Sequence, residues 1–338
     1  MGCRQGGLRG RRRGQRPPAL RVPQAMDAVT RRRFLAVAGG AAAAGALPRV
    51  LAGAPAFPGT LCLFSKHLPS MDASRLARAV RPLGFAGVDL TVRPGGHVDP
   101  ERAAADLPRF VATLRDGGVE VPMITTGVVS ISETAARPIL ETAGRHGIAF
   151  FKPGYYRYTF TDVRKDLDNA ATQLRGLAEL GAECGMQLGF HNHAGYVGGP
   201  VWDVVPIIDG LDPRWAGYYF DVRHAVVEGG DGGWRSALDR VAPRLKMVAI
   251  KDFFWEKGPK GWQQRNCPLG EGMVDWKTFF AMLARSGFKG PVSLHLEYEI
   301  GGATPAATEE RTLAAAARDL ARLKAGLAEA YGGGRASS

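Results

Sequence analysis

Polar side chains that can do chemistry stand at the ends of several apolar, β-prone stretches of this 338-residue chain. Asp221, Lys251 and Glu297 each follow such a stretch, as do the paired histidines His191 and His193. Carboxylates and imidazoles bind divalent metals, and carboxylates, imidazoles and amines can move protons. Gathered in one place, these side chains would polarise an oxygen atom and transfer a proton beside it.

The elements that must position these residues alternate regularly along the chain. Eight β-type runs are expected at 61–64, 87–92, 121–125, 148–152, 186–191, 216–221, 247–252 and 292–297. Helical stretches are expected at 72–81, 101–116, 133–145, 163–184, 202–208, 234–241, 276–285 and 307–330. Such alternation indicates a parallel sheet, and eight units predict a closed (β/α)8 TIM barrel rather than a doubly wound sheet. Because all strands of a parallel barrel point the same way, the residues that follow them meet on one face.

The fifth and sixth strands supply candidate metal ligands. Alternation along the strand places His191 and His193 on the same side, where they could ligate one metal or divide their work between metal and substrate. The alternative is a hydrogen-bonded histidine pair. Asp221 is the natural second ligand; its alternative role is to cap the next helix, which is expected to begin only at residue 234. His224 lies just beyond the strand, where it suits a substrate hydroxyl.

The remaining candidates follow the first, fourth, seventh and eighth strands. Lys251 could pass a proton or polarise a carbonyl, or it could form an ion pair with an aspartate that only orders the loop. Glu297 is predicted to be both a metal ligand and the general base, since a carboxylate can do both. Lys152 is a candidate for binding a negative or carbonyl oxygen, and His67 and His295 are candidates for lining the walls of the substrate site.

The loops after the fourth to seventh strands are long and aromatic: they include the stretches 155–158, 196–199, 226–234 and 253–273. Trp255 in the last of these stretches is the predicted stacking surface for a sugar. The alternative is that these rings cover the top of the barrel or form an oligomer contact.

The first 56 residues have the composition of a leader. An Arg-, Gly- and Pro-rich start is followed by Arg31-Arg32 just before Phe34-Leu35, then by a short Ala-rich run and small residues. This order is typical of a twin-arginine export signal, and the run is too short to span a bilayer. It predicts export by the Tat machinery to the periplasm or beyond, with translation starting at Met1 or Met26. We therefore expect a leader at 1–56, a barrel at 57–331 and a disordered tail at 332–338.

The charge of the chain belongs mostly to this leader. The whole chain carries 44 Lys and Arg against 32 Asp and Glu, a net of +12. Eleven of the basic residues and one acidic residue precede residue 57, which leaves 33 and 31, a net of +2. A nearly neutral barrel gives no electrostatic case for binding nucleic acid, so a DNA-repair enzyme is disfavoured. Four cysteines without a CxxC spacing imply no disulfide framework.

No P-loop, dinucleotide fingerprint or GxSxG elbow occurs in the barrel region. Instead, five segments together resemble the sugar phosphate isomerase/epimerase family with the xylose isomerase-like TIM barrel. They read GMQLGFHNHAGYVGGPVWD, GYYFDVRHAVVEGG, KMVAIKDFFWEK, PLGEGMVDW and GPVSLHLEYE, and they run from residue 185 to residue 299.

The resemblance implies a divalent metal, Mn²⁺, Zn²⁺ or Mg²⁺, held by residues after the fifth to eighth strands. By position, Asp221 and Glu297 match the family's Asp and second Glu. His191 stands where the family has its first Glu, Ala249 stands where it has a His, and His224 matches a histidine that contacts substrate. The resemblance therefore implies a metal bound by His191, Asp221 and Glu297.

The function expected from these residues is an exported, metal-dependent isomerase or epimerase acting on a carbohydrate. Proton transfer would occur beside a metal-polarised carbonyl of a keto-sugar, with a small-molecule sugar as the partner. Two alternatives stay open: a lyase or hydratase acting on a keto-glycoside, and a barrel that binds sugar without catalysis. The departures at His191 and at the seventh strand motivate the second alternative.

Overall fold

The computed structural model of the chain describes residues 57–332. The predicted leader at 1–56, with its export signal, and the last six residues, 333–338, lie outside the described residues. No helix in the described range is long and apolar enough to cross a membrane.

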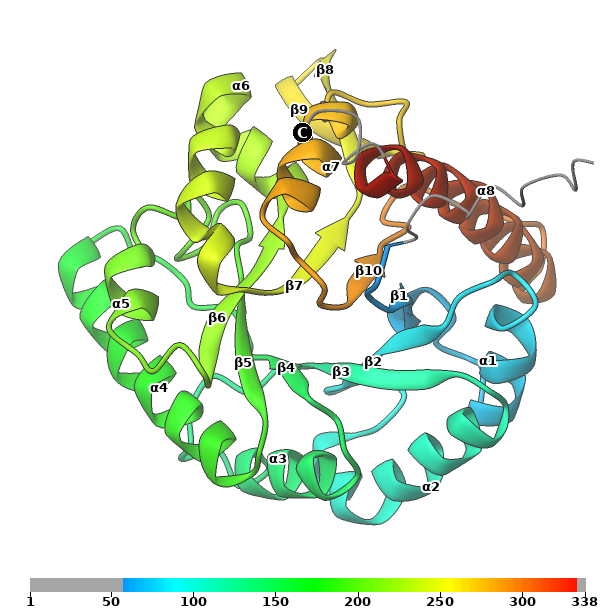
Figure 1. Cartoon of the computed structure of the whole chain (residues 1–338), viewed down its shortest axis with the longest axis horizontal. Helices are drawn as coiled ribbons and strands as arrows, with labels where there is room; N and C mark the ends of the chain where they lie inside the picture. The colour runs from blue at the N-terminus through cyan, green and yellow to red at the C-terminus, as the bar shows by residue number, and fades with distance from the viewer. Residues whose placement is uncertain (1–56, 333–338) are drawn as a thin grey trace, which may run out of the picture. The chain divides into compact units, whose positions relative to one another are not determined.

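Eight parallel strands close into a barrel at the centre of the molecule (Figure 1). They are β1 (Leu61–Phe64), β2 (Gly87–Val92), β3 (Glu120–Thr126), β4 (Phe150–Lys152), β5 (Gln187–His191), β6 (Ala216–Asp221), β7 (Leu245–Ile250) and β10 (Val292–Leu294). Around the ring the order is β1-β10-β7-β6-β5-β4-β3-β2, and β10 closes the barrel by pairing with β1. The fold and all eight predicted barrel strands are confirmed.

Helices form the outer layer around these strands (Figure 1). They are α1 (Ala73–Val80), α2 (Ala103–Asp116), α3 (Ala136–Arg145), α4 (Val163–Glu183), α5 (Val205–Asp209), α6 (Val222–Val241), α7 (Trp276–Arg285) and α8 (Pro305–Gly332). Short 3-10 helices lie at η1 (Ser65–His67), η2 (Pro100–Arg102) and η3 (Ala242–Arg244). The main core fills the space between barrel and helices, because each helix buries its apolar stripe against the strands.

A smaller apolar layer packs together inside the barrel. Met123, Tyr219, Met247 and Ala249 form this cluster, and all four side chains are buried. Each comes from the barrel strands β3, β6 or β7. Polar groups at the strand ends therefore stand on a packed floor rather than over an open channel.

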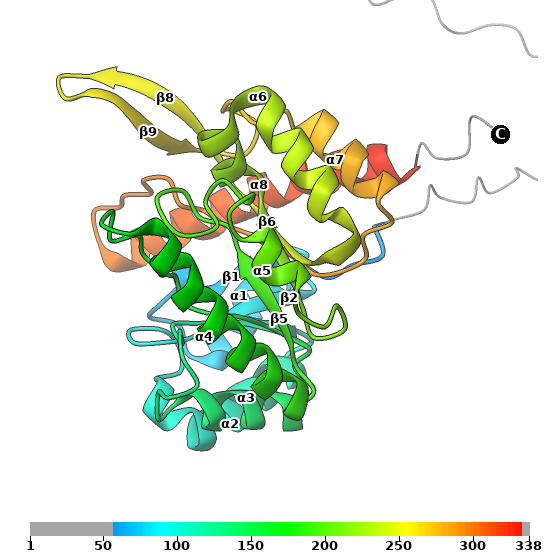
Figure 2. The same cartoon turned by 90° about the vertical axis from the view of Figure 1, so that its left-hand side faces the viewer.

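The stretch 253–273, expected as a long loop, instead contains an antiparallel hairpin. Its strands are β8 (Asp252–Gly258) and β9 (Gly261–Cys267), which pair with each other outside the barrel. Figure 2 shows the hairpin projecting beyond the strands of the barrel. The expectation of an irregular loop was wrong because a hairpin with two exposed faces lacks the alternation of apolar and polar residues that marks a half-buried strand.

The helix expected only at 234–241 begins much earlier. α6 starts at Val222, and the Asp221 side chain caps it by accepting a hydrogen bond from the backbone N–H of His224. A kink at Gly230, with φ of 59° and ψ of −164°, interrupts the helix. The glycines around this kink make the first helical segment resemble a loop in the sequence. The alternative role of Asp221 as a helix cap is therefore confirmed.

Candidate active site

A small cavity of about 120 Å³ opens among the carboxyl ends of the barrel strands. It is walled almost entirely by polar and aromatic side chains: Phe64, Lys66, Arg93, Thr125, Lys152, Tyr155, His191, His193, Tyr219, His295 and Glu297. Five of the residues predicted from the sequence are thus brought together. The convergence follows from the parallel barrel, which directs the end of every strand to the same face.

A second cavity, of about 410 Å³, adjoins the first and shares His193 and Glu297 with it. Its walls come from α6 and the hairpin as well as from the strand ends: His193, Ala194, Gly195, Arg223, His224, Glu228, Gln264, Asn266 and Glu297. Asn266 on β9 donates a hydrogen bond to the backbone carbonyl of Glu297, at 3.0 Å. The hairpin therefore helps to fix the residue that stands between the two cavities.

Lys251 lies between the two carboxylates that were predicted to share a metal. Its Nζ is 3.0 Å from Asp221 Oδ2 and 3.4 Å from Glu297 Oε2. Lys66 reaches the other oxygen of Glu297, at 3.4 Å. The ion pair considered as the alternative role of Lys251 is thus formed, and it includes Glu297 as well as an aspartate.

These contacts control the ionisation of both carboxylates. Burial alone raises the pKa of Glu297, but the Lys251 ammonium and His295 lower it more, to well below its usual range. The pKa of Asp221 also lies well below its usual value, since Lys251, His224 and His191 outweigh burial. Both side chains are therefore ionised at neutral pH.

Both ring nitrogens of His191 are engaged. Nε2 lies 3.1 Å from Asp221 Oδ2, and because an ionised carboxylate only accepts, Nε2 carries the proton. Nδ1 then accepts from the Tyr155 hydroxyl, at 2.9 Å. Burial lowers the pKa of His191 to about 3, so the imidazole is neutral. It has no free lone pair for a metal in this arrangement.

The oxygen and nitrogen atoms predicted to bind a metal are already engaged in contacts within the protein. Oδ2 of Asp221 already faces Lys251 and His191, and its Oδ1 accepts from the backbone of His224. An ammonium stands between Asp221 and Glu297. In the described part of the chain, no group of three or more His, Cys, Asp or Glu side chains is placed to hold a metal ion. The donor set as arranged does not fit a divalent metal.

His193 and His224 are in contact at the border of the two cavities, with ring centroids 3.8 Å apart and ring planes tilted by 38°. Burial first, and then Lys251, lowers the pKa of His193 to about 4, so this ring is neutral as well. His224 Nδ1 lies 3.0 Å from a guanidinium nitrogen of Arg223, which must be the donor. Within residues 57–332, Nε2 of His224 is buried without a hydrogen-bond partner, and it lies 3.8 Å from Asp221 Oδ2. Contact of this nitrogen with a substrate hydroxyl stays a prediction.

Lys152 lies at the end of β4, buried in the wall of the smaller cavity. Its Nζ is 3.4 Å from the centre of the Tyr155 ring. Burial, and then the charge of Arg93, lowers the pKa of this amine well below its usual value. Around the closed barrel, three strands separate β4 from β10 on either side, so Lys152 stands opposite Glu297.

A buried network that was not predicted from the sequence supports the floor of the site. Asp89, in the middle of β2, accepts hydrogen bonds from Thr125 at 2.7 Å, Ser293 at 3.0 Å and Tyr219 at 3.0 Å. The same Tyr219 hydroxyl lies 3.1 Å from His295 Nε2. Burial raises the pKa of Asp89. The signal in the sequence is a lone charged residue inside the strand GVDLTV.

Two predicted substrate-binding residues lie away from the cavities. His67 Nε2 accepts a hydrogen bond from the backbone N–H of Leu296, at 2.9 Å, and so positions the segment before Glu297. Trp255 lies on β8, beside Phe253, and lines neither cavity. The expectation that Trp255 stacks on the sugar assumed a loop folded across the mouth, whereas the hairpin carries this ring outward. Arg93, which follows β2 and lines the smaller cavity, was not predicted.

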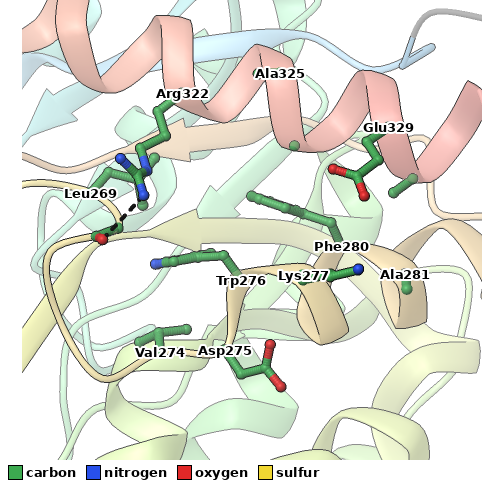
Figure 3. A pocket seen from close by; sticks show the side chains of 13 residues that line it. Leu269, Val274, Asp275, Trp276, Lys277, Phe280, Ala281, Arg322, Ala325 and Glu329 are labelled. Atoms are coloured by element: carbon green, nitrogen blue, oxygen red, sulfur yellow. Dashed lines mark hydrogen bonds between the residues drawn. The ribbon is translucent and has the colours of Figure 1, made fainter. Parts of the chain in front are cut away.

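A further hollow, larger than either of these cavities, lies between α7 and α8 in the outer layer (Figure 3). It has a volume of about 650 Å³ and contains Trp276, Phe280, Arg322 and Glu329. Arg322 donates to the backbone carbonyl of Gly270 across one end. Its walls come from helices and one loop, so it shares none of the strand-end groups and is a separate feature.

Comparison with known proteins agrees with this architecture. The family profile described as xylose isomerase-like TIM barrel matches residues 77–324. The chain belongs to this family. Inosose dehydratase of Bacillus velezensis is 25% identical over 153 residues, which are 42% of this chain and 50% of that protein. Inosose dehydratase of Lacticaseibacillus casei is 25% identical over 157 residues, 43% of this chain and 51% of that protein. The chain spans about half the length of these relatives.

Solved structures share the fold over most of the barrel. L-ribulose 3-epimerase superposes with a TM-score of 0.61 at 18% identity, covering 80% of this chain and 95% of the other. A xylose isomerase-like TIM barrel protein from Mycobacterium smegmatis, in complex with magnesium, superposes with a TM-score of 0.61 at 19% identity. The match covers 83% of this chain and 100% of that protein. The 3-keto-D-glucoside 4-epimerase of E. coli superposes with a TM-score of 0.58 at 18% identity. The match covers 77% of this chain and 99% of that protein. At these identities the likeness shows the fold of this family member.

Proposed function

We propose that this protein is a sugar isomerase or epimerase that moves a proton next to the carbonyl of a keto-sugar or related polyol. The observation that carries the proposal is the placement of Lys152 and Glu297 on opposite sides of one small polar cavity. Epimerisation takes a proton from one face of a carbon and returns one to the other face. Two opposed groups of this kind are what that reaction requires.

The Glu297 carboxylate and the Lys152 amine suit the two half-reactions, removal of a proton and its return to the other face. Glu297 is ionised and can accept a proton. Lys152 loses its proton at a lower pH than an ordinary lysine does, because burial lowers its pKa. In one direction Glu297 removes the proton and Lys152 donates one from the opposite face. In the other direction the roles reverse, as microscopic reversibility demands.

The negative oxygen that forms on the substrate needs donors in the same cavity. Lys66 and Arg93 line it and carry fixed positive charge in this role. As charge grows on the substrate oxygen, it competes with Glu297 for Lys66, which contacts the carboxylate at 3.4 Å. The ion pair between Lys66 and Glu297 weakens, so the carboxylate becomes a stronger base as the proton is transferred.

The larger cavity beyond Glu297 gives room for the rest of a sugar. Arg223, Gln264 and Asn266 offer hydrogen-bond donors there, and His224 lines the same cavity. Metal-assisted polarisation, expected from the sequence, does not fit the donor set, so no step of this scheme uses a metal ion.

Dehydration is the second candidate, and the likeness to inosose dehydratases favours it. The first step would be the same removal of a proton beside the carbonyl, followed by loss of a hydroxyl from the neighbouring carbon. The outcomes differ in mass, because an epimerase preserves the formula and a dehydratase releases water.

The experiment incubates the purified barrel with a panel of keto-sugars, inososes and 3-keto-glycosides in D₂O. Deuterium entering the carbon beside the carbonyl, read by NMR, is the expected result. Mass spectrometry of the same samples separates isomers from dehydrated products. Binding of a sugar by calorimetry without deuterium exchange in any member of the panel would contradict catalysis and favour a sugar-binding barrel.

Export through the Tat pathway is proposed from the leader alone. Replacing Arg31 and Arg32 together by lysine should leave full-length, unprocessed protein inside the cells, because the pathway reads the paired guanidinium groups. Immunoblots of cytoplasmic and exported fractions measure this. The matched control is Arg11→Lys with Arg12→Lys, which should be exported normally. Equal export of both variants would contradict the proposal.

A further inference from the structure

Two carboxylates in the mouth of the barrel share one internal cation. The Lys251 ammonium is 3.0 Å from Asp221 Oδ2 and 3.4 Å from Glu297 Oε2. The side chains of Lys251 and Asp221 are 2% and 0% exposed, and that of Glu297 is 21% exposed. Buried charges of one sign require a partner of the other sign, and here the partner belongs to the chain itself.

The order of the strands explains why Lys251 reaches both acids. In the closed barrel β7 lies between β6 and β10. Asp221 ends β6, Lys251 directly follows β7, and Glu297 follows β10 shortly after its end. A long side chain from the middle strand therefore enters between two carboxylates from its neighbours.

We infer that Lys251 takes the place of the divalent metal in this site, so that the two carboxylates are neutralised without a bound ion. A metal ion placed between Asp221 and Glu297 would stand against the ammonium at close range. Like charges at such a distance repel strongly in a poorly hydrated site. Metal entry thus requires Lys251 to leave, and His191 to give up its hydrogen bond to Asp221.

The inference rests on the proposed function only in treating the cavity as an active site. It deepens that function because it assigns the polarising role to fixed cations of the chain. Its test reads metal binding rather than turnover, so either idea can fail without the other.

The decisive variant is Lys251→Gln, which removes the charge and keeps much of the side-chain length. Two ionised carboxylates would then lack their shared cation and should attract one from solution. With Mn²⁺ as the probe, calorimetry or electron paramagnetic resonance should show binding at least about tenfold tighter than in the unaltered protein. Adding Asp221→Asn to this variant should remove the gain.

Lys66→Gln is the matched control. It removes the other ammonium that contacts Glu297, at 3.4 Å, but leaves Lys251 between the acids. Its Mn²⁺ affinity should stay at the level of the unaltered protein. An equal gain in both variants would overturn the inference, because any loss of positive charge would then explain it.

The unaltered protein provides the second arm, which holds even if Lys251→Gln does not fold. Purified without chelator, it should contain far less than one equivalent of metal, and Mn²⁺ should not raise its melting temperature. One equivalent of metal that disappears in Asp221→Asn would overturn the inference. So would a folded Lys251→Gln variant that binds Mn²⁺ no better than the unaltered protein.

Discussion

Replacing Glu297 with glutamine should lower the rate of proton exchange by about 10³-fold, the range expected for the loss of a general base. Glutamine keeps the length and one carbonyl oxygen of the side chain. That oxygen can still accept from Lys66 or Lys251, and the hydrogen bond from Asn266 to the backbone carbonyl does not depend on the side chain. The fold should therefore survive while the proton acceptor is lost.

The rate is measured as deuterium incorporation into the substrate that is active in the panel. Glu299→Gln is the matched control, since Glu299 is an exposed glutamate two residues further along the same segment. Its exchange rate should stay within about twofold of the unaltered protein, as expected for a surface change away from the site. Comparable losses in both variants, or an unaffected rate in Glu297→Gln, would remove Glu297 from the mechanism.

A large loss with an unchanged melting temperature has a second consequence. It would show that Glu297 acts on the substrate and is not only a partner for Lys251. If Glu297 served only as an ion-pair partner, the opposite pattern would be expected. The buried Lys251 ammonium would lose a partner, so the protein would become less stable. The exchange rate would then fall only as far as the folded structure is disturbed.

The convergence of Asp221, Glu297 and the two histidines could be predicted because it follows from topology. A residue at the end of a parallel strand reaches the same face as every other strand end, whatever its side chain does next. The confirmed strands of the barrel made that inference reliable without any knowledge of side-chain contacts.

The role of Lys251 could not be predicted at the same level. Whether its ammonium meets substrate, metal or carboxylate depends on which strands flank β7 and on the direction of a four-carbon side chain. From the sequence, proton transfer and ion pairing therefore stay equally open. Closure of β10 onto β7 decides between them, because this closure brings Glu297 to the side opposite Asp221.

Asp89 and Arg93 were missed for a different reason. Both belong to β2 or follow it, far along the chain from the polar residues of the last four strands, and an acid inside a buried strand is costly unless other groups satisfy it. Thr125, Ser293 and Tyr219 do so from β3, β10 and β6. Such a network joins residues far apart in the sequence, so only the folded barrel reveals it.

Replacing Lys152 with methionine should lower the epimerisation rate by about 10²- to 10³-fold, because the proton donor on the second face is lost. Methionine keeps the length of the side chain and suits the buried position beside Tyr155, so the cavity wall should hold. Removal of a proton by Glu297 does not need Lys152. Deuterium exchange at the original configuration should therefore fall much less than epimer formation, and this split distinguishes a proton donor from a wall residue.

The pH dependence of the reaction rate is a second, independent test of the role of Lys152. Burial lowers the pKa of Lys152, so the neutral amine forms at a lower pH than in an ordinary lysine. In the direction in which Lys152 removes the proton, the rate should rise with pH through this lowered pKa and level off above it. Lys152→Arg keeps the charge but holds its proton at every accessible pH, so this variant should lose both the rise and the activity. Lys277→Met, at an exposed lysine on α7, should keep the full profile. A profile that is the same in Lys152→Met as in the unaltered protein would assign the rise to another group and leave Glu297 without its opposed partner.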